Sequence, residues 1–287
     1  MKVKKAIIPV AGFGTRFLPA TKAMAKEILP IVDTPTIHYI VKEIVDSGIQ
    51  DILLITSRSK KAVEDYFDRA PELEMILSSA HKDRELQLVK EIASMANVVC
   101  VRQQEMKGSA DAVMKARSFT GNEPFAMLYG DDLIVNKEVP CTAQLIHAYD
   151  TTGKTIVGVQ KVRDEDVSKY GICKVGMTKG RYSEMLGFVE KPTLAEAPSR
   201  LASMGRYVLT SEIYDRILQL KPQPGKELYV TDAIDAIARD GGVFAYEFEG
   251  LRYDIGDKLG FLKATVDFAL ERPELREEFL NYLRQKI

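Results

Sequence analysis

Short apolar runs and longer amphipathic stretches follow one another along the first half of the chain. The short runs predict strands at residues 5–10, 51–56, 98–102 and 125–129, and the stretches between them have helical spacing. One stretch, residues 35–47, ends at Gly48 and places five apolar side chains on one helical face: Ile37, Ile40, Val41, Ile44 and Val45. Strands that alternate with helices predict an α/β fold with a mostly parallel central sheet flanked by helices.

The pattern changes after residue 155, where alternating stretches such as TIVGVQKV predict strands with one buried face. Turn-forming residues at Thr178, Lys179 and Gly180 predict a hairpin. No low-complexity linker and no internal repeat divides the sequence. We therefore expect a single domain over residues 1–287, with two lobes and a C-terminal helical tail.

The tail, residues 265–287, ends in a predicted helix from Pro273 to Ile287 with an apolar face formed by Leu275, Phe279, Leu280 and Leu283. Such a face is buried either on the chain's own core or against another subunit. The sequence leaves both alternatives open.

Composition limits the class of protein. The 287 residues are 46% hydrophobic, and 40 Lys and Arg against 41 Asp and Glu give a formal charge of −1. A balanced charge excludes a broad basic surface, so we expect no nucleic-acid partner. The start of the sequence lacks the apolar run of a signal peptide, and no segment reaches the roughly 18 apolar residues of a membrane span. We expect a cytoplasmic protein with no membrane partner.

Three cysteines, Cys100, Cys141 and Cys173, are scattered and have no C-x-x-C spacing. An odd, scattered set is typical of a protein from a reducing compartment rather than of disulfides or metal ligands. We therefore expect reduced thiols in the core.

Residues that could bind a phosphate group are concentrated just after the first predicted strand, KAIIPV. The segment that follows this strand reads AGFGTRFLPATKAMAKEILP. Gly12 and Gly14 lack a Cβ, so the backbone can take otherwise forbidden angles and bring its N–H groups close to phosphate oxygens. Thr15, Arg16 and Lys26 add a hydroxyl and two cations. The loop is neither the G-x-G-x-x-G turn of dinucleotide-binding proteins nor a P-loop. It predicts binding of a phosphorylated ligand through a less common motif.

Seven further blocks follow this loop. They are VRQQEMKG (101–108), YGDD (129–132), YGI (170–172), FVEKP (188–192), GRYVL (205–209), VTDAI (230–234) and YDIGDKLGFLKA (253–264). In this order, and with the G-x-G-T-R of the loop, they resemble the motifs of the sugar nucleotidyltransferases, in particular the bacterial UTP–glucose-1-phosphate uridylyltransferases. The resemblance implies a nucleotide-binding, Rossmann-like core, mainly residues 1–150, with an inserted sugar-binding lobe containing hairpins, mainly residues 151–264.

The reaction that this resemblance implies joins UTP and glucose 1-phosphate and gives UDP-glucose and pyrophosphate. The acceptor is a phosphate monoester with a second pKa of about 6, so it is largely dianionic at neutral pH and needs no strong base. Repulsion between two polyanions is then the main obstacle. Cations, with Mg²⁺ as the cofactor, should dominate catalysis.

The resemblance also implies which charged residues act. Arg16 and Lys26 hold the triphosphate, Lys191 holds the phosphate of glucose 1-phosphate, and the Glu190 carboxylate accepts hydrogen bonds from sugar hydroxyls. Together with Asp131 in YGDD, the three cations form the expected catalytic set.

Asp131 is the expected Mg²⁺ ligand, because this hard cation prefers carboxylate and phosphate oxygens. Asp132 is a weaker candidate, since paired aspartates also close turns. Asp254 in YDIGD matches an aspartate that holds the metal in related thymidylyltransferases, and it is the second expected ligand.

Base recognition is implied to fall on the backbone of Ala11 and Gly12, on the amide of Gln103 and on Gly108. Ala11, Gln103 and Asp131 each follow a predicted strand, so we expect these three motifs to meet at one edge of the sheet. The other implied contacts are Gly14, Thr15 and Glu27 for the nucleotide, and Gly171 and Gly205, with Glu190 and Lys191, for the sugar phosphate.

Two segments depart from the motifs. AKE (25–27) stands where P-K-E is usual, and GSADA (108–112) stands where G-L-G-H-A is usual. Asp111 is then either an acidic residue at a helix start or a charge that repels the nucleotide.

Three functions stay open at this stage. They are a uridylyltransferase that uses UTP and glucose 1-phosphate, a related enzyme for another nucleotide or sugar 1-phosphate, and a weakly active paralogue that binds nucleotide sugars. We expect the chain to form a homodimer or homotetramer.

Overall fold

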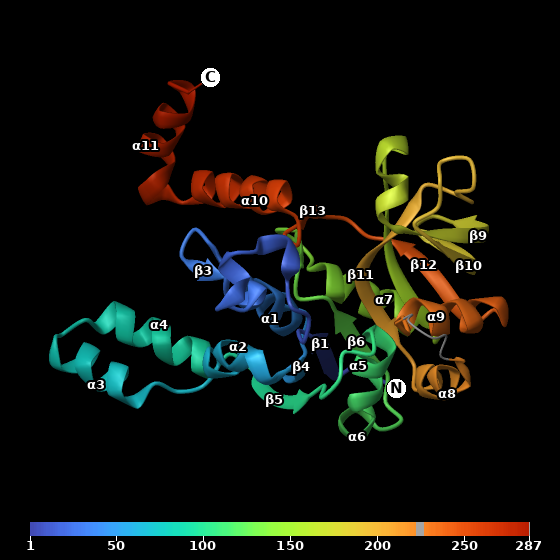
Figure 1. Cartoon of the computed structure of the whole chain (residues 1–287), viewed down its shortest axis with the longest axis horizontal. Coiled ribbons are helices and arrows are strands. Elements are labelled where there is room, and N and C mark those ends of the chain that lie inside the picture. The colour runs from blue at the N-terminus through green and yellow to red at the C-terminus, as the bar shows by residue number, and fades with distance from the viewer. Residues whose placement is uncertain (222–226, 287) are drawn as a thin grey trace.

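The computed structural model describes residues 1–221 and 227–286. A nine-stranded sheet crosses the molecule, and helices cover both of its faces (Figure 1). In spatial order its strands are β5 (Asn97–Arg102), β4 (Asp51–Thr56), β1 (Lys5–Pro9), β6 (Phe125–Leu128), β11 (Leu201–Leu209), β8 (Thr155–Lys161), β12 (Val243–Glu247), β10 (Tyr182–Glu190) and β9 (Gly171–Lys179).

The remaining elements are short ladders, helices and 3-10 turns. The ladders are β2 (Pro30–Ile31) with β3 (Thr34–Pro35), and β7 (Asp132–Val135) with β13 (Leu251–Asp254). The helices are α1 (Thr36–Asp46), α2 (Lys61–Asp65), α3 (Pro71–Ser79), α4 (Asp83–Ala93), α5 (Ser109–Lys115), α6 (Arg117–Thr120), α7 (Cys141–Thr152), α8 (Glu212–Gln219), α9 (Val230–Arg239), α10 (Lys258–Glu271) and α11 (Pro273–Arg284). The 3-10 turns are η1 (Thr15–Phe17), η2 (Ala20–Lys22), η3 (Lys26–Ile28), η4 (Arg58–Lys60) and η5 (Asp164–Lys169).

The four strands β5, β4, β1 and β6 are parallel, and each agrees with its predicted range to within one residue. Beyond β6 the sheet is mixed. β11 lies antiparallel between β6 and β8, β12 is parallel to β8, and β10 and β9 add antiparallel pairs. The α/β class is confirmed. Parallel pairing dominates only the first half, because a hairpin and the antiparallel β11 build much of the second half.

Two apolar cores cover the two faces of the sheet. In β1, Ala6 and Ile8 pack on the face covered by α1 and α7, and Ile7 packs on the face covered by α5, α8 and α9. Strands that are buried on both faces have continuous apolar sequences, which explains the run KAIIPV. The predicted face of α1 is buried except for Val45, which is partly buried, and Gly48 ends the helix with a φ of +87°.

The predicted hairpin is formed by β9 and β10. Lys179 pairs with Tyr182, so Gly180 and Arg181 form the turn, and Gly180 has a φ of +60°. Thr178 and Lys179, predicted as turn residues, are the last residues of β9, because the left-handed backbone at Gly180 delays the reversal.

The tail helix α11 projects from the end of α10, away from the sheet (Figure 1). None of its described residues is buried, so of the two alternatives left open by the sequence, docking on the chain's own core is wrong. Leu275 is exposed and Phe279 is half-buried. Ile287, the last residue of the predicted helix, lies outside the described residues.

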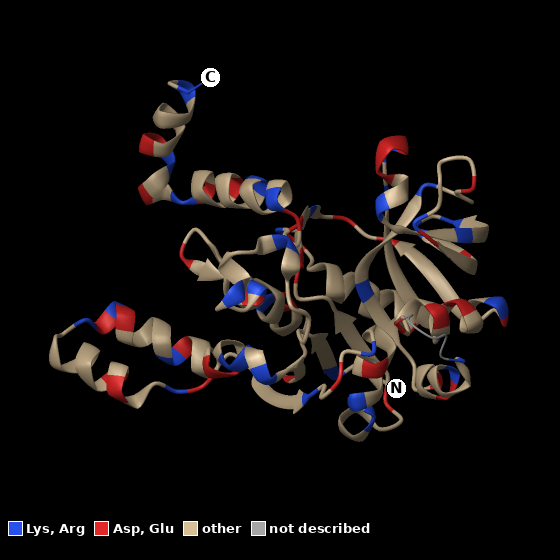
Figure 2. Cartoon of the chain, in the orientation of Figure 1, with Lys and Arg blue, Asp and Glu red and all other residues tan. Residues whose placement is uncertain are grey.

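Charged residues of both signs are interspersed on most helices (Figure 2). This distribution agrees with the formal charge of −1. None of the helices in residues 1–221 and 227–286 combines the length and the apolar character that a membrane crossing requires.

All three cysteines are free thiols, but only Cys141 and Cys173 are in the core. Cys100 is exposed on the edge strand β5, so the expectation of a core thiol is wrong for this residue. Partial burial, together with the carboxylates of Glu64 and Asp68, raises the pKa of Cys100 to about 11.

We therefore expect a chromogenic disulfide reagent to label a single cysteine of the folded chain, and to do so slowly at pH 8. The thiolate is the reactive form, so the rate should rise about tenfold per pH unit between pH 8 and 10. Labelling of Cys100→Ser under the same conditions is the control. Rapid labelling of that variant would contradict the burial of the other two thiols.

Candidate active site

A cavity of about 600 Å³ opens at the carboxyl ends of β1, β5 and β6. Ala11, Gln103 and Asp131, which follow these strands, all line it, so their predicted meeting at one edge of the sheet is confirmed. Every residue to which the sequence assigned a role lines this cavity except Asp254: Ala11, Gly12, Gly14, Thr15, Arg16, Lys26, Glu27, Gln103, Gly108, Asp131, Gly171, Glu190, Lys191 and Gly205.

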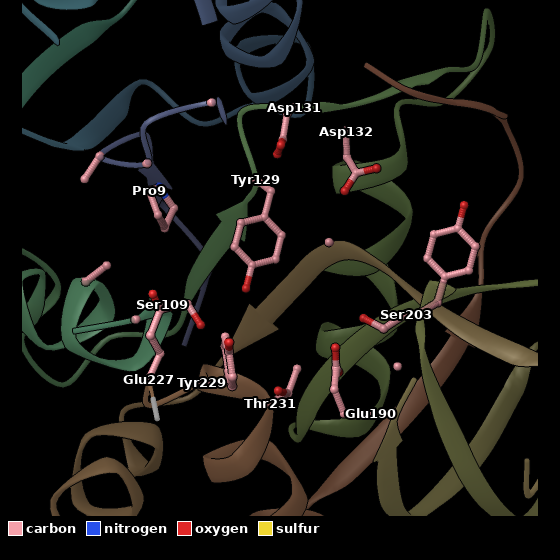
Figure 3. A pocket seen from close by; sticks show the side chains of 18 of the residues that line it. Pro9, Ser109, Tyr129, Asp131, Asp132, Glu190, Ser203, Glu227, Tyr229 and Thr231 are labelled. Carbon is pink, nitrogen blue, oxygen red and sulfur yellow. The ribbon is translucent and has the colours of Figure 1, made fainter. Parts of the chain in front are cut away.

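The side chains divide the cavity into two ends. Asp131 and Asp132 lie at one end and Glu190 and Thr231 at the other, with the Tyr129 ring between them (Figure 3). The carboxylates of Asp131 and Asp132 thus face that of Glu190 across the cavity. A ligand in the cavity can contact both ends.

The glycine-bearing loop needs one of its two glycines for its backbone shape. Gly14 has a φ of +66°, and a Cβ there would lie 2.9 Å from the Lys26 Cβ. The expectation that Gly12 also takes forbidden angles is wrong, because its φ is outside the left-handed region. A Cβ on Gly12 would meet no protein atom within 4 Å, so this backbone faces open space in the cavity.

Lys26 and Asp131 form an ion pair at the acidic end. The Lys26 Nζ donates to Asp131 Oδ2 at 2.5 Å. Burial alone would lower the pKa of Lys26, but the carboxylates of Asp131 and Glu27 outweigh it and raise that pKa. Burial would likewise raise the pKa of Asp131, and Lys26 and Arg16 outweigh it and lower that pKa. Both groups are therefore charged at neutral pH.

Asp254 lies close to Asp131 although it does not line the cavity. Asp131 Oδ2 and Asp254 Oδ1 both lie within 3.3 Å of the point where a Cβ on Gly256 would stand. The two carboxylate oxygens thus lie near one point beside the cavity. Within the described part of the chain, no three His, Cys, Asp or Glu side chains cluster as metal ligands.

Asp132 points to a different partner. Arg252 on β13 donates from Nε to Asp132 Oδ1 at 2.8 Å and from a terminal nitrogen to the Tyr170 hydroxyl at 2.9 Å. Burial, together with the charges of Asp131 and Asp254, raises the pKa of Asp132 to about 6 against the effect of Arg252. Asp132 is therefore paired with Arg252, as Asp131 is paired with Lys26.

A buried ion pair contacts the backbone of the YGDD segment. Arg206 on β11 and Glu43 on α1 are 1% and 5% exposed and lie 2.8 Å apart. The Arg206 guanidinium also donates to the Asp132 carbonyl at 2.6 Å. The Glu43 carboxylate accepts two further hydrogen bonds, from the backbone N–H and the hydroxyl of Thr142. The pair thus joins β11, α1, α7 and the acidic loop.

Lys191 and Glu190 stand at the end of β10, across the cavity. Lys191 has a φ of +46°, which is unfavourable for a residue with a side chain, and its N–H donates to the Tyr170 carbonyl at 3.1 Å. Strained backbone of this kind clusters at functional sites. Gly205 comes close to the acidic end, where a Cβ would lie 2.8 Å from Asp132 Oδ2.

Glu27 is more enclosed than a simple ligand-binding residue. Its side chain is 1% exposed, and Lys60 donates to its Oε2 at 2.7 Å. Its Oε1 is buried and has no hydrogen-bond partner among the described residues. Burial raises the pKa of Glu27, and Lys60 and Lys26 act against this.

The end of the cavity next to β5 carries Gln103 and Gly108. The Gln103 amide nitrogen donates to the Gly108 carbonyl at 3.1 Å and to Asp111 Oδ2 at 2.8 Å. Asp111 lies in the first turn of α5 but does not point to solvent, since its side chain is 20% exposed. It does not line the cavity and stands behind Gln103.

The sequence did not single out several residues that line the cavity. Arg252 lies one residue before the block YDIGDKLGFLKA, so its position next to a motif was the available signal. The same signal was available for Tyr129, Tyr207 and Thr231, which lie within the blocks YGDD, GRYVL and VTDAI, and for Tyr229, which directly precedes VTDAI. Ser203 in β11 lies outside the blocks and had no local signal.

Comparisons with known proteins agree with this geometry. The nucleotidyl transferase family profile matches residues 5–270. The chain is 49% identical over 284 residues to a UTP–glucose-1-phosphate uridylyltransferase from Staphylococcus haemolyticus, covering 99% of this chain and 98% of that protein.

Solved structures give the same result. A UTP-bound UGPase from Acinetobacter baumannii is 38% identical, with a TM-score of 0.88, and the match covers 98% of each chain. A UDP-glucose pyrophosphorylase complexed with UDP-glucose is 36% identical, with a TM-score of 0.85, covering 94% of this chain and 100% of that chain. The likeness extends over both lobes of the chain.

Proposed function

Because the chain belongs to the nucleotidyl transferase family, we propose that it transfers a uridylyl group from UTP to glucose 1-phosphate and releases pyrophosphate. The product is UDP-glucose. The observation that carries this proposal is the single cavity lined by Arg16 and Lys26 from the glycine-bearing loop and by Lys191 from the second lobe. Two phosphorylated substrates need cations from both lobes, since each brings its own negative charge.

At the nucleotide end, Arg16 and Lys26 bind the triphosphate, and the open backbone at Gly12 lets its N–H groups approach the ligand. The Lys26–Asp131 pair keeps the Lys26 ammonium charged and oriented before UTP binds. Asp131 and Asp254 fit a hard divalent cation, because their carboxylate oxygens converge beside the cavity. Mg²⁺ held there would neutralise charge on the reacting phosphates.

At the sugar end, Glu190 accepts hydrogen bonds from sugar hydroxyls and Lys191 binds the phosphate of glucose 1-phosphate. Orientation of the acceptor oxygen towards the α-phosphorus then accounts for much of the rate, because no proton needs to be removed from the dianion. Gly171 lines the same end, where a Cβ would lie 2.9 Å from Glu190 Oε2, and Gly205 lines the cavity nearer to Asp132. We assign both glycines to the sugar phosphate.

The test is a matrix of nucleoside triphosphates and hexose 1-phosphates, with Mg²⁺ and with a chelator, in which pyrophosphate release is measured. We expect the pair of UTP and glucose 1-phosphate to give the highest kcat/KM and the chelator to abolish release. A higher value for another pair would reassign the substrates. Absence of release from every pair would leave only nucleotide-sugar binding.

Replacing Lys191 with alanine should raise the KM for glucose 1-phosphate at least tenfold and change the KM for UTP far less. A charge-assisted hydrogen bond to phosphate contributes about 1.5–3 kcal/mol, which corresponds to this factor. The matched control is Lys179→Ala, an exposed lysine at the end of β9. Equal increases in both constants would contradict the assignment of separate cations to the two substrates.

We also propose that residues 1–150 mainly bind nucleotide and residues 151–264 mainly bind sugar phosphate, that the protein is cytoplasmic, and that it forms a homodimer or homotetramer. Exposed apolar side chains on α3 and α11, such as Met75 and Leu275, are 65% and 37% accessible and support self-association. Light scattering of the purified chain tests this, and a monomer at micromolar concentration would exclude it.

A further inference from the structure

Gln103 is held by two groups that can only accept hydrogen bonds. Its side-chain nitrogen donates to the Gly108 carbonyl and to the Asp111 carboxylate, and its backbone N–H donates to the Thr56 carbonyl at 2.8 Å. The residue is only 5% exposed. The reverse amide orientation would bring Oε1 against two acceptor oxygens and would lose both bonds. The orientation of this amide is therefore fixed by its partners.

The amide oxygen of Gln103 is what remains for a ligand. Among the described residues none donates to Gln103 Oε1, and this atom is not one of the buried atoms without a partner. Since Gln103 lines the cavity, Oε1 is accessible from it. The ligand thus meets an acceptor at this point and no donor from the same side chain.

We propose that Asp111 is a positioning residue that holds Gln103 with its acceptor towards the nucleobase and thereby selects uracil over cytosine. This inference rests on the proposed function, in which Gln103 contacts the base. Uracil carries an N–H donor at N3, whereas cytosine has a lone pair there, so an acceptor on the protein suits the first and opposes the second.

A carboxylate at position 111 fixes the orientation of the Gln103 amide better than an amide side chain would. Lys115, one turn further along α5, lies 3.6 Å from Asp111 Oδ1, so the other oxygen is available to Gln103. An asparagine at position 111 can donate as well as accept, so the reversed Gln103 amide would lose only its bond to the Gly108 carbonyl and would keep a bond to residue 111. The reversed amide presents a donor to the cavity, which is compatible with cytosine.

The experiment measures equilibrium binding of UTP and of CTP, without sugar phosphate, to the wild-type chain and to Asp111→Asn. We expect the wild type to bind UTP more tightly than CTP. In the variant, the Kd for CTP divided by the Kd for UTP should be about tenfold smaller than in the wild type. Asp111→Ser, which keeps a good helix-start residue, serves as a second variant if Asp111→Asn is unstable. The control is Glu105→Gln, which removes an exposed charge from the preceding loop and should leave the ratio unchanged.

Several results would overturn the inference. If Asp111 mainly repels the triphosphate, both nucleotides would bind more tightly by the same factor and their ratio would not change. If it only stabilises α5, both would bind more weakly by the same factor. In a Gln103→Ala background, Asp111→Asn should have no further effect on the ratio, and a persisting effect would exclude the route through Gln103. A chain that shows the expected ratios but releases no pyrophosphate would refute the proposed function alone.

Discussion

Replacing Asp131 with alanine should lower the rate of pyrophosphate release by more than about a hundredfold at saturating Mg²⁺, which is the scale of one preorganised electrostatic element. Two losses combine in this variant. The Lys26 ammonium loses its partner at 2.5 Å, and the carboxylate next to Asp254 disappears from the position that we propose for a divalent cation. The free energy of unfolding should change far less, because Asp131 is part-exposed at the cavity wall.

Single-turnover kinetics with and without added Mg²⁺ measure this effect. Asp46→Ala is the matched control, since Asp46 pairs with Lys42 on the exposed face of α1 and is remote from the cavity. Asp131→Asn separates charge from shape, and we expect it to be almost as inactive as Asp131→Ala. Turnover near that of the wild type in both variants would move the metal to Asp254 and Asp132.

The second large effect concerns stability. Replacing Arg206 with alanine should reduce the free energy of unfolding by about 3–5 kcal/mol, because it leaves the buried Glu43 carboxylate without its counter-ion. Burial would lower the pKa of Arg206, and Glu43 outweighs it and raises that pKa, so the guanidinium is charged in the folded chain. Activity should fall as well, since Arg206 donates to the Asp132 carbonyl in the acidic loop.

Urea denaturation followed by circular dichroism measures the loss. Lys137→Ala is the control, because Lys137 and its partner Glu271 are 77% and 54% exposed, and such pairs contribute at most about 1 kcal/mol. The double variant Glu43→Met with Arg206→Met should recover part of the loss, since it leaves no unpaired buried charge. A loss below about 1 kcal/mol for Arg206→Ala would show that the pair is dispensable.

Local sequence patterns were enough to predict the parallel strands and the edge at which the site forms. Apolar runs with the composition of strands are buried on both faces in β1, β4 and β6, and their chain order places their carboxyl ends together. The resemblance of the sequence blocks to nucleotidyltransferase motifs then assigned chemical roles to residues that line one cavity. Strand boundaries were right to within one residue because the strands coincide with the short apolar runs.

Contacts between distant residues had no such signal. Arg206 and Glu43 are 163 positions apart. Arg206 is the one charged residue of β11, and Glu43 stands next to Lys42 on an amphipathic helix, so nothing local marks the two as partners. The turn prediction was right for Gly180 and wrong for Thr178 and Lys179, because strand pairing continues as far as Lys179 and Tyr182. The apolar face of α11 predicted burial, but periodicity does not say on which surface a face is buried.

The position of β11 in the sheet has a consequence for synthesis of the protein on the ribosome. β6 pairs with β1 on one side and with β11 on the other. The pairing with β1 is possible once Leu128 has been synthesised, whereas β11 is complete only at Leu209. For some 80 residues of elongation the nascent parallel sheet therefore ends in an apolar strand with free backbone N–H and C=O groups, FAML. Free edges of this kind pair readily with other chains. Translation that stops between these two points releases an aggregation-prone fragment, so chaperone binding to stalled chains should peak there.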